Sequence, residues 1–302
     1  MRLRATTLRG QTPRADIGAD IGADNGADSA DSGVLRDLVQ LLRCPWCEGG
    51  LTLLDAPGSR ARVEFATLRC ESCGRRTSIT DGIWDAMGPH RASRSAAQLA
   101  NVLAPTARFY EDLWRVRSLR LLSGRPFPIA EELAELGRAI RPGSGDLIVD
   151  VACSEGLYAR ELARQGATVI AVDHSRTFLR RVLLRAPDLP VVAVRALAQQ
   201  LPLLDGVVCG AVMGGSLNEI GDAPAAIQEM TRVLEPNGRL FSMSLTVATT
   251  NRGRLLQQLA RPSGLRFFTQ GETERIFTDA GLVGLESRLD RVVLRISGSI
   301  TS

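Results

Sequence analysis

Residues 147–173 constrain the fold of this chain more than any other stretch. A short apolar run at 147–151 contains one acid, and a turn of small residues follows it at 152–156. Residues 157–165 then repeat apolar side chains at helical spacing. A second apolar run at 168–172 ends at Asp173. The pattern predicts a strand, a tight turn, a helix and a second strand. The turn falls at the carboxyl end of the first strand, where open α/β sheets bind nucleotide-like ligands.

The turn and the acids are placed for a ligand that carries a ribose. A carboxylate at the end of the second strand, Asp173, can accept hydrogen bonds from a ribose diol. The stretch resembles the cofactor motif of class I S-adenosylmethionine (SAM)-dependent methyltransferases, D-x-G-x-G-x-G. Asp150 and Gly156 fit that motif, whereas Ala152 and Ser154 stand where glycine is expected. Either Cβ can crowd the cofactor or strain a backbone that needs a positive φ.

The chain downstream resembles further motifs of the same family, in order and at matching spacing. Leu-Pro-Leu-Leu-Asp-Gly begins at 201, an apolar run follows at 207–213, and Gly-Gly-Ser-Leu-Asn-Glu comes next. The segment 232–240, Arg-Val-Leu-Glu-Pro-Asn-Gly-Arg-Leu, resembles the family's RVLKPGGRL. The resemblance covers roughly 105–302 and is closest to the branch that includes the quinone-biosynthesis enzymes. It implies a Rossmann-like, seven-stranded, mostly parallel sheet with helices on both faces.

The resemblance also implies where SAM would bind. The candidate cofactor-binding residues follow the first three strands, and they are Asp150, Ala152, Cys153, Ser154, Gly156, Asp173, His174, Leu197 and Ala198. Leu197 stands where related enzymes often have an acid at the adenine amino group. We expect SAM binding to survive these departures, at micromolar affinity or weaker, because Asp150, Gly156 and Asp173 remain.

The catalytic residues are unknown at this stage, and the sequence indicates no general base. Methyl transfer from a sulfonium is an in-line displacement with a neutral leaving group, so the enzyme mainly supplies proximity and alignment. We expect His174 at the adenine edge or in solvent. Asn218 and Glu219 follow the fourth strand and are candidates for facing the substrate. The thiols of Cys153 and Cys209 are expected to be small buried groups rather than nucleophiles.

Two Cys-x-x-Cys pairs near the N-terminus form the most specific local motif. They are separated by 22 residues, and apolar runs at 51–54 and 63–68 predict a hairpin between them. Two such knuckles on a hairpin place four thiolates at the corners of a tetrahedron, which suits Zn²⁺. The ligands would be Cys44, Cys47, Cys70 and Cys73. Disulfides or a redox pair are the alternatives, and we favour structural zinc because a cytosolic enzyme rarely forms disulfides.

This module resembles the zinc ribbons that precede some bacterial ribosomal-RNA guanine methyltransferases. It is equally similar to stand-alone activator proteins that bind methyltransferases, and residues 77–84 resemble the end of such a ribbon. A closed site with four cysteine ligands leaves no open position for a substrate. We therefore expect the metal to stabilise a domain with too little core of its own.

Four segments are predicted. Residues 1–33 carry a short Ala-Asp-Ile-Gly type repeat with almost nothing to bury, which indicates a disordered tail. Residues 34–90 form the zinc ribbon, beginning with a helix at 34–42 and having a core separate from the larger domain. Residues 91–125 form a basic linker with seven arginines, two acids and a helix at 106–122. Residues 126–302 form the methyltransferase domain.

Composition excludes few partners. The net charge of +4 is too mild to argue for nucleic acid by itself, and all 37 basic residues are arginine. No apolar run approaches the ~18 to 20 residues that span a bilayer, and the N-terminus lacks the apolar region of a secretory signal. We therefore expect a cytoplasmic protein without membrane association.

Three functions remain open from the sequence. The first is SAM-dependent methyl transfer to a small molecule, which we favour. The second is methylation of ribosomal or transfer RNA, with the ribbon and the linker as the docking surface. The third is a non-catalytic binding protein, with a ribbon that recruits a protein partner.

Overall fold

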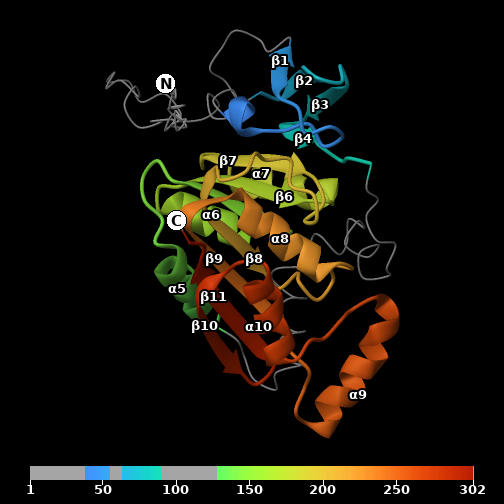
Figure 1. Cartoon of the computed structure of the whole chain (residues 1–302), viewed down its shortest axis with the longest axis vertical. Helices are drawn as coiled ribbons and strands as arrows, with labels where there is room; N and C mark the ends of the chain where they lie inside the picture. Colours follow the sequence, from blue (N-terminus) through green and yellow to red (C-terminus); the bar gives the residue numbers. More distant parts are fainter. Residues whose placement is uncertain (1–37, 55–62, 90–127, 302) are drawn as a thin grey trace, which may run out of the picture.

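The computed structural model describes residues 38–54, 63–89 and 128–301. Their strands form one eleven-stranded sheet in the order β1-β2-β3-β4-β7-β6-β5-β8-β9-β11-β10 (Figure 1). The last seven strands of that order account for the expected seven-stranded sheet. The prediction of seven strands was nevertheless wrong for the whole sheet, because four strands of the cysteine-rich module extend it at the β7 edge.

The seven-stranded part is parallel except at one end. Strands β7, β6, β5, β8 and β9 run parallel, and β11 and β10 add two antiparallel pairings beyond β9. The bounds are β5 (Leu147–Val151), β6 (Thr168–Asp173), β7 (Val191–Arg195), β8 (Val208–Gly214), β9 (Leu234–Leu245), β10 (Val283–Asp290) and β11 (Val293–Ser299).

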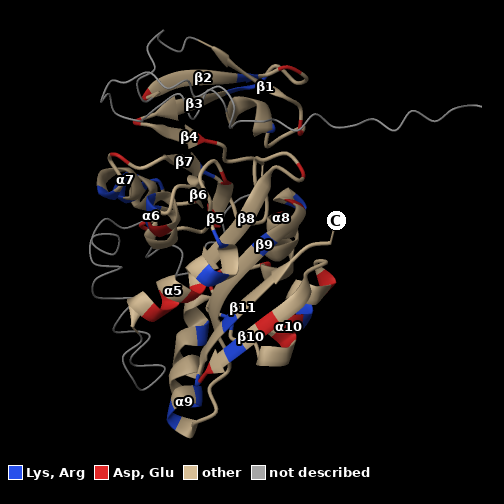
Figure 2. Cartoon of the chain, turned by 90° about the vertical axis from the view of Figure 1, so that its left-hand side faces the viewer, with Lys and Arg blue, Asp and Glu red and all other residues tan. Residues whose placement is uncertain are grey.

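Helices cover both faces of this part of the sheet, as expected from the resemblance. Figure 2 shows α5, α6 and α7 on one side and α8 and α10 on the other. The two buried clusters agree, because Ile148 packs with the first set of helices and its neighbour Val149 packs with the second. The bounds are α5 (Ile129–Ile140), α6 (Leu157–Arg164), α7 (Arg176–Arg185), α8 (Ala223–Val233), α9 (Asn251–Ala260), η3 (Arg261–Ser263) and α10 (Gln270–Asp279).

The central strands read as near-continuous apolar runs because both faces are buried. Every residue of β5 is buried, and only Thr168 of β6 is not. Parallel strands covered on both faces show this pattern rather than an alternation of polar and apolar residues. Since the sequence carries that signal directly, the predicted strands at 147–151, 168–172 and 191–195 agree with the structure.

The cysteine-rich module is a four-stranded antiparallel meander joined to the main sheet. Its last strand, β4, pairs in parallel with β7, and the register places Ile83 beside Ala193 and Asp85 beside Arg195. The module comprises η1 (Val39–Leu41), β1 (Leu51–Leu54), β2 (Phe65–Cys70), β3 (Arg76–Thr80) and β4 (Ile83–Asp85). The first part of the helix expected at 34–42 lies outside the described residues; Leu38 is helical, and the 3₁₀ turn η1 follows it.

The module and the main sheet share one core, which contradicts the separate cores expected from the sequence. Leu68, Ile79 and Trp84 belong to the same buried cluster as Val172 and Val194. Trp84 is fully buried, and its indole N–H donates to Thr77 Oγ1 at 2.9 Å. Loss of the module would therefore expose apolar surface of the main sheet.

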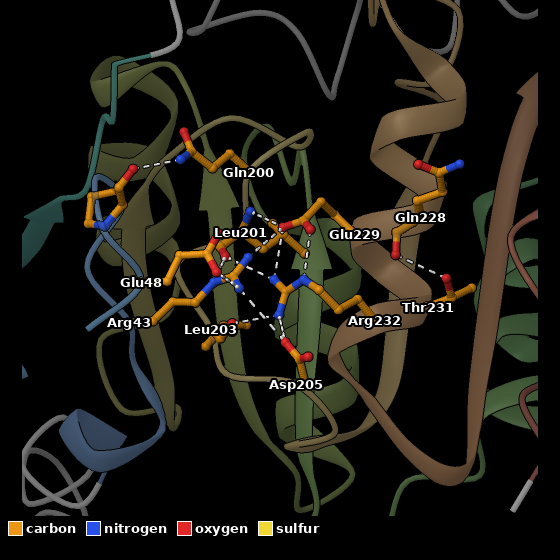
Figure 3. A network of polar contacts seen from close by, with 11 residues as sticks. Arg43, Glu48, Gln200, Leu201, Leu203, Asp205, Gln228, Glu229, Thr231 and Arg232 are labelled. Atoms are coloured by element: carbon orange, nitrogen blue, oxygen red, sulfur yellow. Dashed lines mark hydrogen bonds and ion pairs between the residues drawn. The ribbon is translucent and has the colours of Figure 1, made fainter. Parts of the chain in front are cut away.

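Polar contacts form a second connection between the module and the main domain, beside the shared core. Arg43 of the module reaches Glu48 at 3.3 Å and Glu229 of α8 at 3.5 Å (Figure 3). Glu229 also pairs with Arg232 at 2.7 Å, and Arg232 pairs with Asp205 at 2.6 Å. The carboxylate of Glu229 thus joins one arginine of the module to one of the main domain.

Two predicted segments cannot be compared. The tail at 1–33 and the helix at 106–122, with most of the basic linker, lie outside the described residues. Among the helices that the structure describes, none combines the length and apolarity needed to cross a membrane.

Candidate functional site

The predicted cofactor residues meet where the strand order reverses. The chain leaves β5 for β6 on one side, and β8 lies on the other side of β5. In open α/β sheets, the carboxyl ends of strands at such a switch point form the ligand crevice. The turn 152–156 follows β5, Asp173 ends β6, and Gly214 ends β8 at this same edge.

Three residues of the turn have left-handed backbone conformations. The φ angles are 54° at Ala152, 51° at Ser154 and 72° at Gly156. Glycine takes this conformation freely, whereas a residue with a Cβ is strained there by about 1 kcal/mol or more. The sequence left the sign of φ open at 152 and 154. The structure has the strained alternative at both.

Hydrogen bonds from neighbouring strands hold the turn in that conformation. The N–H of Cys153 donates to the Val172 carbonyl at 3.0 Å, and the Ser216 hydroxyl donates to the Ala152 carbonyl at 3.0 Å. The N–H of Gly156 donates to the Cys153 carbonyl at 2.8 Å. These bonds tie the turn to both β6 and the loop after β8, which sets its shape despite the missing glycines.

The buried carboxylate of Glu155 links the turn to α7 through two ion pairs. Glu155 is 2% exposed and lies 3.4 Å from Arg181 and 3.0 Å from Arg185. Its own carbonyl also accepts from the Arg160 guanidinium. Glu155 was not among the residues predicted from the sequence, although an acid inside the motif and two arginines one helical turn apart were visible signals.

Asp173 is a buried acid that accepts a hydrogen bond from the turn. It is 4% exposed, and its Oδ2 accepts from the Ser154 N–H at 3.0 Å while its Oδ1 accepts from the Ser175 N–H at 2.7 Å. Burial raises the pKa of this carboxyl above its ordinary value, and the charge of His174 and these backbone N–H groups oppose that rise. A buried acceptor that still has free lone pairs suits a ribose diol.

Asp150 acts on the local structure of the site. It is 1% exposed, and its Oδ2 accepts from the Ala159 N–H at 2.9 Å, in the first turn of α6. The carboxylate therefore satisfies one of the backbone donors left open at a helix N-terminus. Contact of Asp150 with a cofactor stays a prediction.

The residues expected around adenine follow β6 and β7. His174 Nδ1 lies 3.5 Å from Asp173 Oδ1, and His174 Nε2 has no hydrogen-bond partner among the residues that the structure describes. The Ala196 N–H donates to the Asp173 carbonyl at 3.2 Å, which brings the segment with Leu197 and Ala198 beside the β6 end. The structure thus gathers the predicted residues at one edge of the sheet.

Asn218 has a role in the fold. Its side-chain amide donates to the carbonyls of Leu245, at 2.8 Å, and Arg266, at 2.6 Å, and its Oδ1 accepts from the Leu245 N–H at 2.8 Å. The residue is 2% exposed. These bonds clamp the end of β9 to the segment before α10, and contact of Asn218 with a substrate stays a prediction.

The two other thiols are poor nucleophiles. Burial, reinforced by the charges of Asp150 and Asp173, raises the pKa of Cys153 well above its ordinary value. Burial, with Asp146 and Glu235, raises the pKa of Cys209 to about 12. The thiolate is the reactive form, so neither residue is suited to attack at neutral pH.

The four N-terminal cysteines converge as predicted. Their sulfur atoms all lie within 4.8 Å of one another, with Cys44 to Cys73 at 3.8 Å and Cys47 to Cys70 at 3.4 Å. A tetrahedral Zn²⁺ with Zn–S bonds of about 2.3 Å requires sulfur separations of about 3.8 Å. The donor set and its spacing therefore fit a closed zinc site.

The two knuckles repeat one backbone design, which supports that fit. A residue with φ near 60° to 70° follows each second cysteine, Glu48 at 61° and Gly74 at 70°. The N–H of Glu48 donates to the Cys44 carbonyl at 2.9 Å, and the N–H of Gly74 donates to the Cys70 carbonyl at 3.0 Å. Two equivalent turns aim four sulfur atoms at one point.

Comparison with known proteins agrees with the site. Residues 149–242 match the family described as a methyltransferase domain. A chloroplastic methyltransferase of Arabidopsis thaliana is 28% identical over 81% of this chain and 74% of the relative. The demethylmenaquinone methyltransferase of Corynebacterium kroppenstedtii is 33% identical over 34% of this chain, which spans only 43% of that relative.

A solved structure shows the same fold. A chain of the complex between the Trm112 methyltransferase activator of Haloferax volcanii and a methyltransferase aligns with a TM-score of 0.51 and 16% identity. The alignment covers 65% of this chain and 97% of the other. The family match to residues 149–242 and the shared fold agree with the resemblance noted in the sequence.

Proposed function

We propose that this protein transfers the methyl group of SAM to a small-molecule acceptor. The observation that carries the proposal is the meeting of Asp173 with the turn 152–156 at the switch point of the sheet. Asp173 would hold the ribose, the turn would lie along the methionine part, and Leu197 and Ala198 would lie near the adenine. When bound, SAM supplies an electrophilic methyl group on a sulfonium.

The residues of this site are suited to binding and alignment. No general base is assigned, and the thiol of Cys153 in the turn is held protonated by burial. An in-line transfer gains chiefly from proximity, for which effective molarities of about 10⁵ to 10⁸ M are possible. An acceptor that must lose a proton would release it to solvent, because no residue of the described site is assigned as its base. The proposal therefore places the catalytic contribution in the shape of the site.

A small acceptor is favoured over RNA. Two relatives are named for methylation of quinones, a demethylmenaquinone and a 2-phytyl-1,4-naphthoquinone. Arginines of α7 form ion pairs within the chain, Arg180 with Asp81 and Arg185 with Glu155. The basic linker, on which the RNA alternative depends, lies outside the described residues. A quinone-like acceptor is thus the first class to test.

One observation favours the non-catalytic alternative. Ala152 and Ser154 both carry a Cβ at positive φ in the turn where the family usually has glycine. A protein whose cofactor pocket had decayed would tolerate such residues, and the ribbon could then serve a partner. The edge of β4 is already paired with β7 of the same chain, so a partner would need another surface of the ribbon.

We further propose that the four cysteines hold one structural Zn²⁺. The separations between their sulfur atoms support this, and the repeated knuckle geometry supports it independently. Because a four-thiolate site is closed, the metal would stabilise the ribbon and take no part in methyl transfer. The cytoplasmic location expected from the sequence also stays a proposal, since the Arabidopsis relative is named as chloroplastic.

Mass spectrometry of the gently purified protein would test the SAM proposal. Co-purified SAM or its demethylated product is the expected result, followed by label transfer from methyl-labelled SAM to a reduced naphthoquinone. Label transfer to total RNA but not to quinones would favour the RNA alternative. Binding of SAM without transfer to any acceptor would favour the non-catalytic one.

A further inference from the structure

The last strand of the ribbon ends beside the proposed cofactor site. The parallel register of β4 and β7 places Asp85 next to Arg195, the final residue of β7. Asp85 Oδ2 accepts from Arg195 Nη1 at 2.8 Å. The backbone closes the same corner, because the Ala86 N–H donates to the Arg195 carbonyl at 2.9 Å. A ribbon carboxylate therefore reaches the carboxyl edge where the site residues gather.

Arg195 continues this contact into the loop after β6. Its Nε donates to the His174 carbonyl at 3.0 Å, so one guanidinium bridges Asp85 and the His174 peptide group. The neighbouring residue, Asp173, carries the carboxylate proposed for the ribose, and Ser175 donates its N–H to that carboxylate at 2.7 Å. A shift of the His174 peptide group would move both partners of that hydrogen bond.

The ion pair is a poor candidate for a purely stabilising role. The side chains of Asp85 and Arg195 are 31% and 33% exposed. Ion pairs with this exposure contribute about 0 to 1 kcal/mol to folding. The pair lies at the junction of the ribbon with the loop 173–175. A role in positioning that loop therefore explains the pair better than a contribution to folding stability does.

The ribbon has a second ion pair that serves as an internal comparison. Asp81, in the turn before β4, lies 2.9 Å from Arg180 and 3.5 Å from Arg176. It is 44% exposed and lies at the opposite end of β4 from Asp85. Asp81 joins the ribbon to α7, and no described residue of the loop 173–175 donates a hydrogen bond to its carboxylate.

We propose that Asp85 is a positioning residue for the cofactor site. Through Arg195 it holds the His174 carbonyl, and so it keeps Asp173 and Ser175 in the conformation that receives the ribose. The ribbon would thereby tune cofactor affinity from outside the methyltransferase domain. The inference rests on the proposed function for its binding readout, but its structural part can be tested without any ligand.

The first experiment compares Asp85→Asn with Asp81→Asn in the full chain. Titration calorimetry should show SAM binding weakened about two- to fivefold in Asp85→Asn, the scale of a partly exposed ion pair. Asp81→Asn should bind SAM like the wild type, because its partners lie on α7. Asp85→Glu keeps the charge and should recover most of the affinity. Equal weakening in both Asn variants would overturn the proposal.

The second experiment needs no cofactor. Residue-resolved amide hydrogen exchange at Ser175 should be faster in Asp85→Asn than in wild type, and unchanged in Asp81→Asn. If the wild type binds no SAM, the proposed function fails, and the exchange result still tests whether Asp85 holds the loop 173–175 through Arg195. If hydrogen exchange and SAM affinity are both unchanged in Asp85→Asn, the positioning role of Asp85 is overturned and the proposed function still stands.

Discussion

The backbone N–H of Ser154 donates to Oδ2 of Asp173 at 3.0 Å, across the gap between the turn after β5 and the end of β6. This bond holds Ser154, which has a left-handed φ of 51°, against Asp173, the carboxylate proposed to bind the ribose. Residue 154 is therefore held by its backbone, and its hydroxymethyl group is incidental to the turn. That distinction can be tested directly.

Replacing Ser154 with glycine should tighten SAM binding or leave it unchanged. Glycine removes strain of about 1 kcal/mol but adds a similar entropy to the unfolded chain, so the melting temperature should change little. Asn237→Gly is the matched control, because Asn237 has a φ of 66° at the start of β9, away from the site. Calorimetry that shows tenfold weaker binding in Ser154→Gly alone would identify the hydroxyl as a cofactor contact.

Replacing Glu155 with glutamine should destabilise the protein by about 1 to 3 kcal/mol, because two arginines lose a buried charged partner. Denaturant unfolding measures the change. Glu161→Gln is the control, since Glu161 pairs with Arg164 at 3.5 Å in a more exposed position. The control should lose less than about 0.5 kcal/mol. Equal losses in the two variants would show that Glu155 does not secure the turn.

The raised pKa of Asp173 predicts how stability depends on pH. A carboxyl whose pKa is higher in the folded state binds its proton more tightly there than in the unfolded chain, where the pKa is about 3.9. Its contribution to stability is complete below that value and is lost as pH rises through the folded pKa. The charged form therefore opposes folding at neutral pH.

The measurement compares melting temperatures of His174→Gln and His174→Gln/Asp173→Asn without SAM. The shared background removes titration of the neighbouring imidazole. As pH falls from about 8 to about 5, the difference should move in favour of the protein that keeps Asp173. A difference that is constant, or that moves the other way, would contradict the direction of the pKa shift.

Removal of the proposed zinc should destabilise the edge of the main sheet as well as the ribbon. Elemental analysis should find one Zn²⁺ per chain in wild type and none in Cys70→Ser. Because Leu68 and Trp84 share a core with Val194, this variant should also expose the β7 edge of the main sheet. Proteolysis and thermal unfolding can follow that exposure, with Cys209→Ser as the control thiol. Wild-type protein with four freely titratable thiols and no metal would contradict the zinc proposal.

The sequence predicted the parts of the fold that repeat a local pattern. Runs such as 147–151 and 191–195 are apolar throughout because parallel strands are buried on both faces, so their positions agree with the structure. The cysteine spacing likewise predicted the convergence of Cys44, Cys47, Cys70 and Cys73. In both cases the physical cause acts over a few residues along the chain.

The remaining features depend on contacts between distant segments. The three residues of β4 carry no signal that they pair with β7, about a hundred positions later, so the joined sheet was missed. The positive φ of Ala152 depends on the bond that Ser216 donates to its carbonyl and on the bond that Cys153 donates to Val172, which a residue type cannot reveal. The structural role of Asn218 was not predicted for the same reason, since its partners Leu245 and Arg266 are distant in sequence.

Calorimetric titration of SAM into wild type, Asp173→Ala and Asp146→Ala tests the central claim most directly. Asp146 accepts from the Gly143 N–H at 2.7 Å before the amino end of β5, so it is a matched carboxylate away from the site. Loss of a hydrogen bond to a charged group should weaken binding to Asp173→Ala by about 1.5 to 3 kcal/mol, roughly 10- to 150-fold, with Asp146→Ala unchanged. Equal affinity in all three proteins, or no SAM binding by any of them, would contradict the account.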